Sequence, residues 1–412
     1  MIFDAWFSKN QARIERSLAE LINIQTVTPE EHRAFEFATR YFEGLGFSVI
    51  FEPAHPKLHE HPSFSPHRFS RIATQNGNLR ARLTKPWRKK KVLFNCHLDV
   101  VPGSENFPQA FDCRVQDGMI IGRGACDTKN NLIMLGEAVR FMLESGIPMQ
   151  RAPQIDMVVE EEIGGNGTLS TILHGTDAEE VICLEPTGLM VYRGHRGCVS
   201  FEIEVPGRPV HMGSHSKGTN AIEWTYETIK LLKQLERKLL SEARRDRDFN
   251  KWKRPLQLNI GIISGGQWSG SVPERCTLWG DMGFLPNYSI EEIKDLIRRT
   301  CSSVRHKWVA DNIKVNFNGL CNDAYIMDPK AQLVKDLISA GARNGPAQIT
   351  SHGWNVSCDA RHYNKILGLP VVIFGSGQLS MAHSAHECVE MAELKRGCRI
   401  IADFLGSSPS DA

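Results

Sequence analysis

Histidines and carboxylates that can bind metal ions follow four apolar segments of the sequence. These residues are His97 and Asp99 after segment 91–96, Glu160–Glu162 after segment 155–159, Glu185 after segment 181–184 and His383 after segment 370–374. Such apolar segments are typical of buried strands, and open α/β sheets bind ligands where the carboxyl ends of their strands meet. Carboxylates together with two imidazoles suit Zn²⁺, Co²⁺ or Mn²⁺. Because one tetrahedral ion needs fewer ligands than this, the pattern indicates two ions.

Most of these residues, taken singly, also have a simpler explanation. His97 and Asp99 are two positions apart and so share one face of a strand, where a buried hydrogen-bonded pair is the stronger interpretation. Asp127 lies in the segment GRGACDTK before a helix, and it is equally suited to cap that helix or to serve a site. The glutamate triplet differs, because adjacent carboxylates at the end of a buried strand repel one another unless a cation neutralises them. Metal coordination therefore explains Glu160–Glu162 better than a surface run of charge.

The elements that would position these residues fall into two patterns. The first is the alternation typical of an α/β sheet, with expected strands at 47–51, 91–96, 154–159, 181–184 and 370–374 and expected helices at 31–44, 131–145 and 329–342. The second begins after residue 194, with expected strands at 198–205, 256–263, 275–284 and 313–317 and helices at 220–244 and from 289. We therefore expect a catalytic α/β domain with a mixed sheet flanked by helices, formed by residues 1–195 and 317–412. A ferredoxin-like α+β domain at 196–316 is inserted into it.

One segment, residues 53–71, follows neither pattern. It contains His55, His59, His61 and His67 among four prolines. Because no carboxylates or thiolates stand around these histidines at ligand spacing, the segment is interpreted as a solvated loop and not as a metal site.

Composition excludes several classes of function. The 412 residues carry 49 Lys and Arg against 47 Asp and Glu, a net charge of +2, which provides no general field for nucleic acid or an anionic membrane. No stretch approaches the ~18 apolar residues that cross a bilayer, and the N-terminus lacks the pattern of a signal peptide. The 11 cysteines show no C-x-x-C spacing, as expected of reduced thiols. These features predict a cytoplasmic protein that binds neither nucleic acid nor a membrane.

Six motifs together resemble one known family. They are HLDVVP, GRGACDTK, EEEIGG, LEPTG, GRPVHMGS and AHSAHE, in this order along the chain. The chain resembles the dinuclear-zinc metallopeptidase family of acetylornithine deacetylase, succinyl-diaminopimelate desuccinylase, aminoacylase-1 and the bacterial glutamate carboxypeptidase, from about residue 10 to residue 405.

The resemblance implies roles for individual residues. It implies that two divalent ions, zinc above cobalt or manganese, are held by His97, Glu185, Glu162 and His383, with Asp127 bridging them. Asp99 resembles the carboxylate that orients His97, and Glu161 resembles the general base. His211, otherwise a surface-loop histidine, resembles the lid residue that stabilises the oxyanion in the partner subunit's site. The inserted domain would then be a lid that forms a homodimer.

The chain departs from the family at positions that bind the substrate carboxylate in several relatives. Ser271 stands where many relatives have Asn before Val-Pro, and Asp281-Met282-Gly283 replaces Asp-x-Arg. Arg361, in CDAR, is the remaining candidate for binding that carboxylate, and a structural Arg–Asp pair is an equal alternative. Asn130 and Asn131 replace glycines after Lys129.

The resemblance implies hydrolysis of the amide bond of an N-acyl amino acid, as in acetylornithine deacetylase. A dipeptidase, carboxypeptidase or desuccinylase with the same mechanism is the alternative. Amide formation or acyl transfer on the same scaffold is a further one. A metal-free binding protein is disfavoured, because no residue of the metal set is missing.

Overall fold

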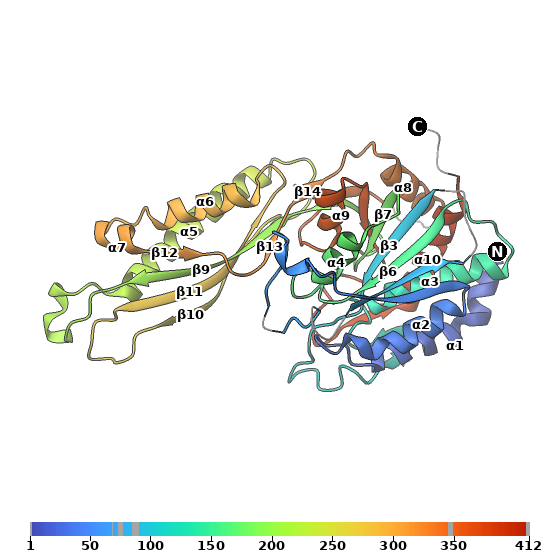
Figure 1. Cartoon of the computed structure of the whole chain (residues 1–412), viewed down its shortest axis with the longest axis horizontal. Coiled ribbons are helices and arrows are strands. Elements are labelled where there is room, and N and C mark those ends of the chain that lie inside the picture. The colour runs from blue at the N-terminus through green and yellow to red at the C-terminus, as the bar shows by residue number, and fades with distance from the viewer. Residues whose placement is uncertain (1, 68, 73–76, 85–89, 345–348, 409–412) are drawn as a thin grey trace. The chain divides into compact units, whose positions relative to one another are not determined.

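The computed structural model describes all residues except 1, 68, 73–76, 85–89, 345–348 and 409–412, and the chain divides into two compact units (Figure 1). The first unit comprises Met1–Gly194, Met327–His352 and Cys358–Ala412, and the second comprises His195–Ile326 and Gly353–Ser357. The second unit thus extends ten residues beyond the expected boundary at 316. It does so because Cys321 and Asn322 pair with strand β9 (Gly197–Pro206). Among the described residues, no helix is both long and apolar enough to cross a lipid bilayer.

The second unit has the β-α-β-β-α-β order expected from the sequence. Its main elements are β9, α5 (Ala221–Ala243), β10 (Leu258–Gly265), β11 (Arg275–Phe284), α6 (Ile290–Cys301) and β12 (Lys314–Asn316). Shorter elements are η3 (Met212–Lys217), α7 (Lys307–Asn312), β13 (Cys321–Asn322) and β14 (Tyr325–Ile326). The antiparallel strands lie in the order β10-β11-β9-β12, so β10 is an edge strand. Ser289 and Glu292 form a capping box that begins α6.

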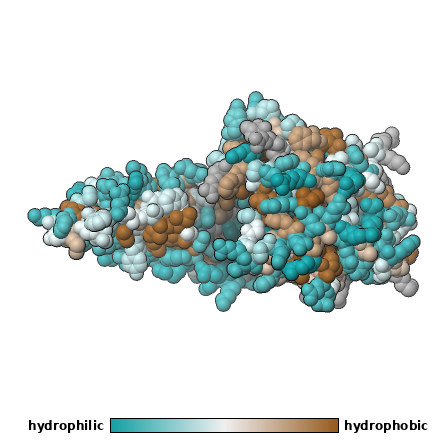
Figure 2. All heavy atoms as spheres, turned by 90° about the horizontal axis from the view of Figure 1, so that it is seen from below, coloured by the Kyte–Doolittle hydropathy of each residue, from teal (hydrophilic) through white to brown (hydrophobic). Residues whose placement is uncertain are grey.

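Large hydrophobic side chains remain exposed on this unit. They are Met212, Ile222 and Tyr226 together with Ile262, Ile263 and Trp268. Figure 2 shows hydrophobic atoms gathered on the surface that this unit presents from below.

The first unit contains the remaining helices and strands. Its helices are α1 (Ile2–Asn23), η1 (Glu31–Ala34), α2 (Phe35–Glu43), η2 (Leu58–Glu60), α3 (Lys129–Glu144), α4 (Asn166–His174), α8 (Gln332–Asn344), α9 (Ala360–Leu367) and α10 (Met391–Gly406). Its strands are β1 (Phe47–Pro53), β2 (Gly77–Leu83), β3 (Lys91–His97), β4 (Arg114–Gln116), β5 (Met119–Ile121), β6 (Ala152–Val158), β7 (Glu180–Leu184), β16 (Val371–Phe374) and β17 (Cys388–Glu390). Strands β8 (Val191–His195) and β15 (Ser351–Trp354) lie at the boundary of the two units.

The main sheet of this unit is mixed, as expected. Its strands lie in the order β1-β2-β6-β3-β7-β16-β8. Strands β6, β3, β7 and β16 are parallel to their neighbours within this group, whereas β1, β2 and β8 pair antiparallel. The carboxyl ends of the four parallel strands therefore lie along one edge, and the next residues along the chain are brought together there.

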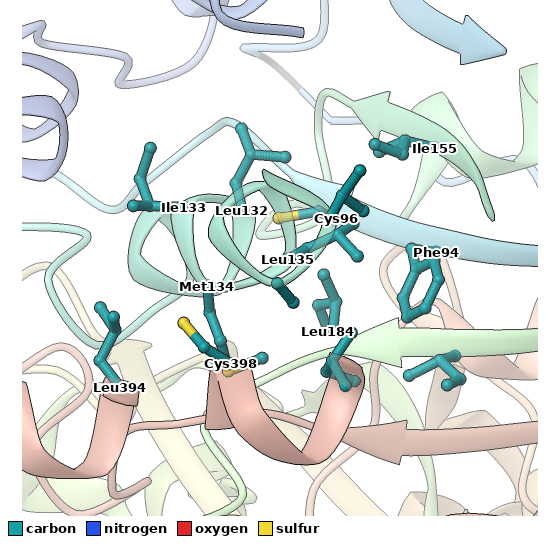
Figure 3. Close-up of a cluster of buried hydrophobic side chains, with 14 of the residues drawn as sticks. Phe94, Cys96, Leu132, Ile133, Met134, Leu135, Ile155, Leu184, Leu394 and Cys398 are labelled. Carbon is teal, nitrogen blue, oxygen red and sulfur yellow. The ribbon is translucent and has the colours of Figure 1, made fainter. Parts of the chain in front are cut away.

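Both faces of the sheet are covered by helices, and β3 shows how. Phe94 and Cys96 point into the main hydrophobic core with side chains of α3 and α10, as Figure 3 shows. The intervening Asn95 points to the other face, where its amide donates to Thr168 of α4 and Tyr363 of α9. A strand buried on both faces needs a nearly continuous apolar sequence, which is why these strands could be recognised from the sequence.

Candidate metal centre and active site

The end of β3, the end of β7 and the loop before α3 bring three possible metal ligands together. One ligand atom from each of His97, Asp127 and Glu185 lies within 4.8 Å of the others, and all three residues are buried. His97 Nδ1 lies 2.8 Å from the backbone oxygen of Asp99, which can only accept a hydrogen bond. Nδ1 therefore carries the proton, and in neutral His97 the Nε2 lone pair is free to bind a metal.

A second group shares Asp127 with the first. One ligand atom from each of Asp127, Glu162 and His383 lies within 4.8 Å of the others. His97 Nε2 is 3.1 Å from Asp127 Oδ1, whereas His383 Nε2 is 3.4 Å from Asp127 Oδ2 and 2.9 Å from Glu162 Oε1. The two oxygens of Asp127 thus face different ligand groups, the arrangement that a carboxylate bridging two cations requires.

Burial and mutual contacts shift the pKa values of this cluster. Burial by itself lowers the pKa of His97, but its hydrogen bonds with Asp127 and Asp99 outweigh this and raise it well above its usual value. Hydrogen bonds with Asp127 and then with Glu162 raise the pKa of His383 to about 10. Burial raises the pKa of the Glu162 and Glu185 carboxyls. Carboxylates gathered in so buried a place need nearby positive charge to stay ionised.

Glu387 holds the loop that carries Asp127, and sequence reasoning assigned it no role. Its Oε1 accepts the backbone N–H groups of Gly124, Cys126 and Asp127 at 2.8, 3.1 and 3.1 Å. Its other oxygen forms a buried ion pair with Arg123. Because these partners lie about 260 residues away along the chain, no local pattern could have revealed the contact.

Asp99 contacts the glutamate segment as well as His97, the residue that the resemblance expects it to orient. Its carboxylate is 3.6 Å from His97 Nδ1, which bonds instead to the Asp99 backbone oxygen. The carboxylate accepts the backbone N–H groups of Glu161 and Glu162 at 3.2 and 2.9 Å. Asp99 therefore positions the imidazole through its backbone oxygen and the glutamate segment through its carboxylate.

The three glutamates of the triplet point to different surroundings. Glu162 joins the second ligand group, and Glu161 belongs to neither group. Burial, followed by the charge of Asp359, raises the pKa of Glu161. Glu160 is fully buried, and its carboxylate is bound by Ser70, Arg71, Ile72 and Asn166 instead of facing the other glutamates. The sequence assigned a metal to Glu162 and the role of base to Glu161 but no role to Glu160, and the structure shows Glu160 bound to residues 70–72.

Arg361 is not an exposed cation in this structure. Its side chain is 4% exposed, and its guanidinium donates to the backbone oxygens of Cys358 and Gly164 at 2.6 and 2.9 Å. Its distance from Asp359 Oδ1 is 3.7 Å. These contacts favour the structural alternative over the binding of a substrate carboxylate.

Asn130 and Asn131, which follow Lys129, both form hydrogen bonds with the turn that contains Ser376. The side-chain amides of Asn130 and Asn131 both donate to the backbone oxygen of Ser376, at 2.9 and 3.1 Å. Lys129 itself is buried, and its amine donates to the backbone oxygens of Leu21 and Ile24, at the end of α1. The loop of Asp127 is thus tied to two distant parts of the first unit.

His211 belongs to the second unit and is exposed there. It precedes η3, and its Nδ1 accepts the backbone N–H of Gly213 at 3.1 Å. This contact leaves Nε2 as the ring nitrogen that can act on another molecule.

A family model matches most of the chain. The model of peptidase family M20/M25/M40 matches residues 93–407. The chain belongs to this family. It is therefore a metal-dependent hydrolase of the peptidase and deacylase type.

Two relatives and one solved structure show which proteins this M20 protein is similar to. A succinyl-diaminopimelate desuccinylase of Gluconacetobacter diazotrophicus is 26% identical over 402 residues, covering 94% of each chain. An acetylornithine deacetylase of Myxococcus xanthus is 25% identical and covers 75% of this chain and 79% of its own. Among solved structures, a dinuclear metal binding peptidase of the M20 family from Bacillus subtilis shares the fold, with a TM-score of 0.67 at 12% identity and coverage of 97% and 98%.

Proposed function

We propose that this M20 protein hydrolyses the amide bond of an N-acyl amino acid, in the manner of acetylornithine deacetylase. The observation that carries the proposal is the pair of ligand groups that share Asp127. His97 and Glu185 would hold one divalent ion and Glu162 and His383 the other, with Asp127 between them. The donor set fits Zn²⁺, and Co²⁺ or Mn²⁺ as well, because it combines imidazole nitrogens with carboxylate oxygens.

Two such ions would polarise the amide carbonyl and lower the pKa of the attacking water. Glu161 would take the proton from that water and deliver it to the nitrogen of the departing amine. Two observations support this role. Glu161 is outside both ligand groups, so its carboxylate is not needed as a ligand, and Asp99 fixes its backbone through the N–H at 3.2 Å.

The second unit would act as a lid and join two chains into a homodimer. Its edge strand β10 exposes Ile262 and Ile263 to 60% and 55%, and α5 exposes Tyr226 to 62%. An exposed apolar edge strand is a liability for a monomer and is satisfied by pairing with a second copy. In the dimer, His211 of one chain would donate a hydrogen bond to the oxyanion at the other chain's site.

A panel of substrates tests the proposed reaction. We expect the purified protein to release free amine from an N-acetyl amino acid faster than from N-succinyl amino acids, N-formyl amino acids or dipeptides. We expect two divalent ions per chain, and complete loss of turnover after chelation that readdition of Zn²⁺ or Co²⁺ reverses. Full activity after exhaustive chelation, or one ion per chain, would contradict the proposal.

The same panel separates the alternatives. Preference for a dipeptide or an N-succinyl substrate would identify a dipeptidase or desuccinylase with the same residues in the same roles. Absence of hydrolysis, with amide formation from an amine and an acyl donor, would identify the synthetic alternative.

A further inference from the structure

Part of the histidine-rich segment 53–71 is bound to the glutamate triplet and is not a freely solvated loop. We define the docked loop as residues 65–67 and 69–72, because residue 68 lies outside the described residues. Leu58 and Ile72 are buried, at 1% each, in a small apolar cluster with Val159 and Leu169. The prediction of a solvated loop is therefore wrong for this part of the segment.

The first attachment is to Glu160. Its Oε1 accepts the backbone N–H groups of Arg71 and Ile72 at 2.7 and 2.9 Å. Its Oε2 accepts the Ser70 hydroxyl at 2.8 Å and the Asn166 amide at 2.9 Å. All four partners are donors and the carboxylate is fully buried, so charge-assisted hydrogen bonds hold the loop.

The second attachment lies on the other side of Glu161 and Glu162. The Ser65 backbone N–H donates to Asn166 Oδ1 at 2.9 Å, and the Asn166 amide donates back to the Ser65 oxygen at 3.0 Å. The Ser65 hydroxyl donates to the backbone oxygen of Ile163 at 3.2 Å. The loop therefore touches the residue before Glu161 and the residue after Glu162, and it borders the candidate active site.

The charge of the docked loop indicates what it would contact. The sequence SPHRFSRI carries basic residues and no carboxylate. Of the described residues, His67 and Arg71 are exposed. Arg361, the basic residue expected to bind a substrate carboxylate, is buried against backbone oxygens. Arg71 differs from Arg361 in exposure. Its guanidinium also donates to a backbone oxygen, that of Ser70 at 2.6 Å, but the residue is exposed and lies next to the segment that Glu160 holds.

We propose that the docked loop is a wall of the substrate site, that Arg71 binds the substrate carboxylate, and that Glu160 is the positioning residue that holds the loop there. This inference rests on the proposed function, because it assigns the carboxylate of the same N-acyl amino acid to the loop.

The experiment compares an N-acetyl amino acid with its uncharged α-carboxamide. The variants are Arg71→Gln and Glu160→Gln, with Arg16→Gln and Glu60→Gln as matched controls, because Arg16 and Glu60 are exposed and lie outside the docked loop. An amide at position 160 cannot satisfy four donors, since its NH₂ group must face two of them. Turnover, metal content and the rate of limited trypsin cleavage after Arg68 and Arg71 are measured for each protein, with cleavage after Arg71 omitted for Arg71→Gln.

For Arg71→Gln we expect KM for the acid to rise about tenfold, as loss of one charge-assisted hydrogen bond predicts, with kcat and KM for the carboxamide nearly unchanged. For Glu160→Gln we expect faster cleavage of the loop, a similar rise in KM for the acid and an unchanged metal content. The controls should match the wild type. If Glu160→Gln does not fold, Ser70→Ala is measured instead, because it removes one hydrogen-bond donor of the loop. It should increase the cleavage rate and KM for the acid by smaller factors.

Equal effects of Arg71→Gln on the acid and the carboxamide, or none on either, would overturn the assignment of Arg71. Faster cleavage of Glu160→Gln without a change in KM would show that the loop is only structural. If the wild-type protein cleaves neither compound, the proposed function fails. The inference is then tested by calorimetric binding of the two compounds, in which Arg71→Gln must weaken binding of the acid alone.

Discussion

Glu387 and Asp127 are 260 residues apart in the sequence, yet Glu387 Oε1 accepts the backbone N–H of Asp127 at 3.1 Å. The same oxygen binds two more N–H groups of that loop, so one buried carboxylate determines where the shared carboxylate of the two ligand groups lies. A carboxylate that touches no proposed ligand atom thus controls the geometry of the metal centre.

Glu387→Gln should weaken metal binding without removing a ligand. We expect the dissociation constant for Zn²⁺ to rise by about tenfold or more. The free energy of unfolding should fall by about 3 kcal/mol, because Arg123 loses its buried partner. Metal titration and urea denaturation measure these changes. Glu390→Gln, three residues later and exposed, should change neither. Wild-type metal affinity in Glu387→Gln would contradict the positioning role.

Glu161→Gln should separate metal binding from turnover. We expect two ions per chain and a loss of kcat of about 10²-fold or more, because the amide cannot take a proton from water. Glu162→Gln, which changes the neighbouring carboxylate, should instead reduce the metal content. The measurements are metal analysis of the purified variants and release of free amine. Loss of metal from Glu161→Gln would place this residue among the ligands.

Gly165→Ala should lower the stability of the protein more than Gly146→Ala, although both glycines have a positive φ. Gly165 has φ +76°, and a Cβ there would lie 2.2 Å from Asp359 Oδ1 and 2.9 Å from Arg361 Nη2. Gly146 has φ +65° with nothing within 4 Å. We expect Gly146→Ala to cost about 1 kcal/mol of stability and Gly165→Ala at least about 2 kcal/mol more, by thermal or urea unfolding. If the two variants lose equal stability, the turn after Glu162 can shift enough to accommodate a Cβ at position 165.

Glu31 should make stability depend on pH. Burial, and then the charge of Asp99, raises the pKa of Glu31 from 4.5 to about 8. Because the folded chain favours the protonated carboxyl, this contribution to stability is complete below pH 4.5 and is lost as the pH rises towards 8. Glu31→Gln should therefore gain stability relative to wild type across this range, by at most about 1.4 kcal/mol per pH unit.

The measurement for Glu31 is urea denaturation between pH 5 and pH 8 on metal-loaded protein. Glu36→Gln is the control, because Glu36 is exposed on α2. Parallel stability curves for wild type and Glu31→Gln would show that Glu31 is ionised throughout.

Ile262→Asp should dissociate the proposed homodimer. A charge on the exposed edge strand β10 opposes pairing with a second copy, so we expect the mass in solution to halve and turnover to fall. Val115→Asp changes a comparably exposed apolar residue of the first unit, at 47% exposure, and should leave both unchanged. If His211 serves the other chain's site, mixing and reassembling His211→Ala with Glu161→Gln should restore part of the activity that each variant lacks. A fully active monomer would contradict the proposal.

The sequence alone determined the four parallel strands of the catalytic sheet and the residues at their ends, whereas strands β2 and β8 of the same sheet were not predicted. The parallel strands could be recognised because strands buried on both faces need nearly continuous apolar runs, as in Val92–Phe94 of β3. Their polar end residues then had to meet, since parallel strands end at one edge. His97, Asp127, Glu162, Glu185 and His383 were predicted in this way together with the family resemblance, and the structure brings them into two groups.

Only the tertiary structure decided what each polar side chain contacts. Glu160, Glu161 and Glu162 are adjacent and chemically alike, yet one holds a loop, one lies outside both ligand groups and one joins a group. Arg361 is an arginine, a residue type that often binds carboxylates, but here its guanidinium donates to backbone oxygens. Residue types and local periodicity determine which elements form. The partner of a buried polar group depends on which distant segment comes within about 3 Å of it, and only the packed chain determines that.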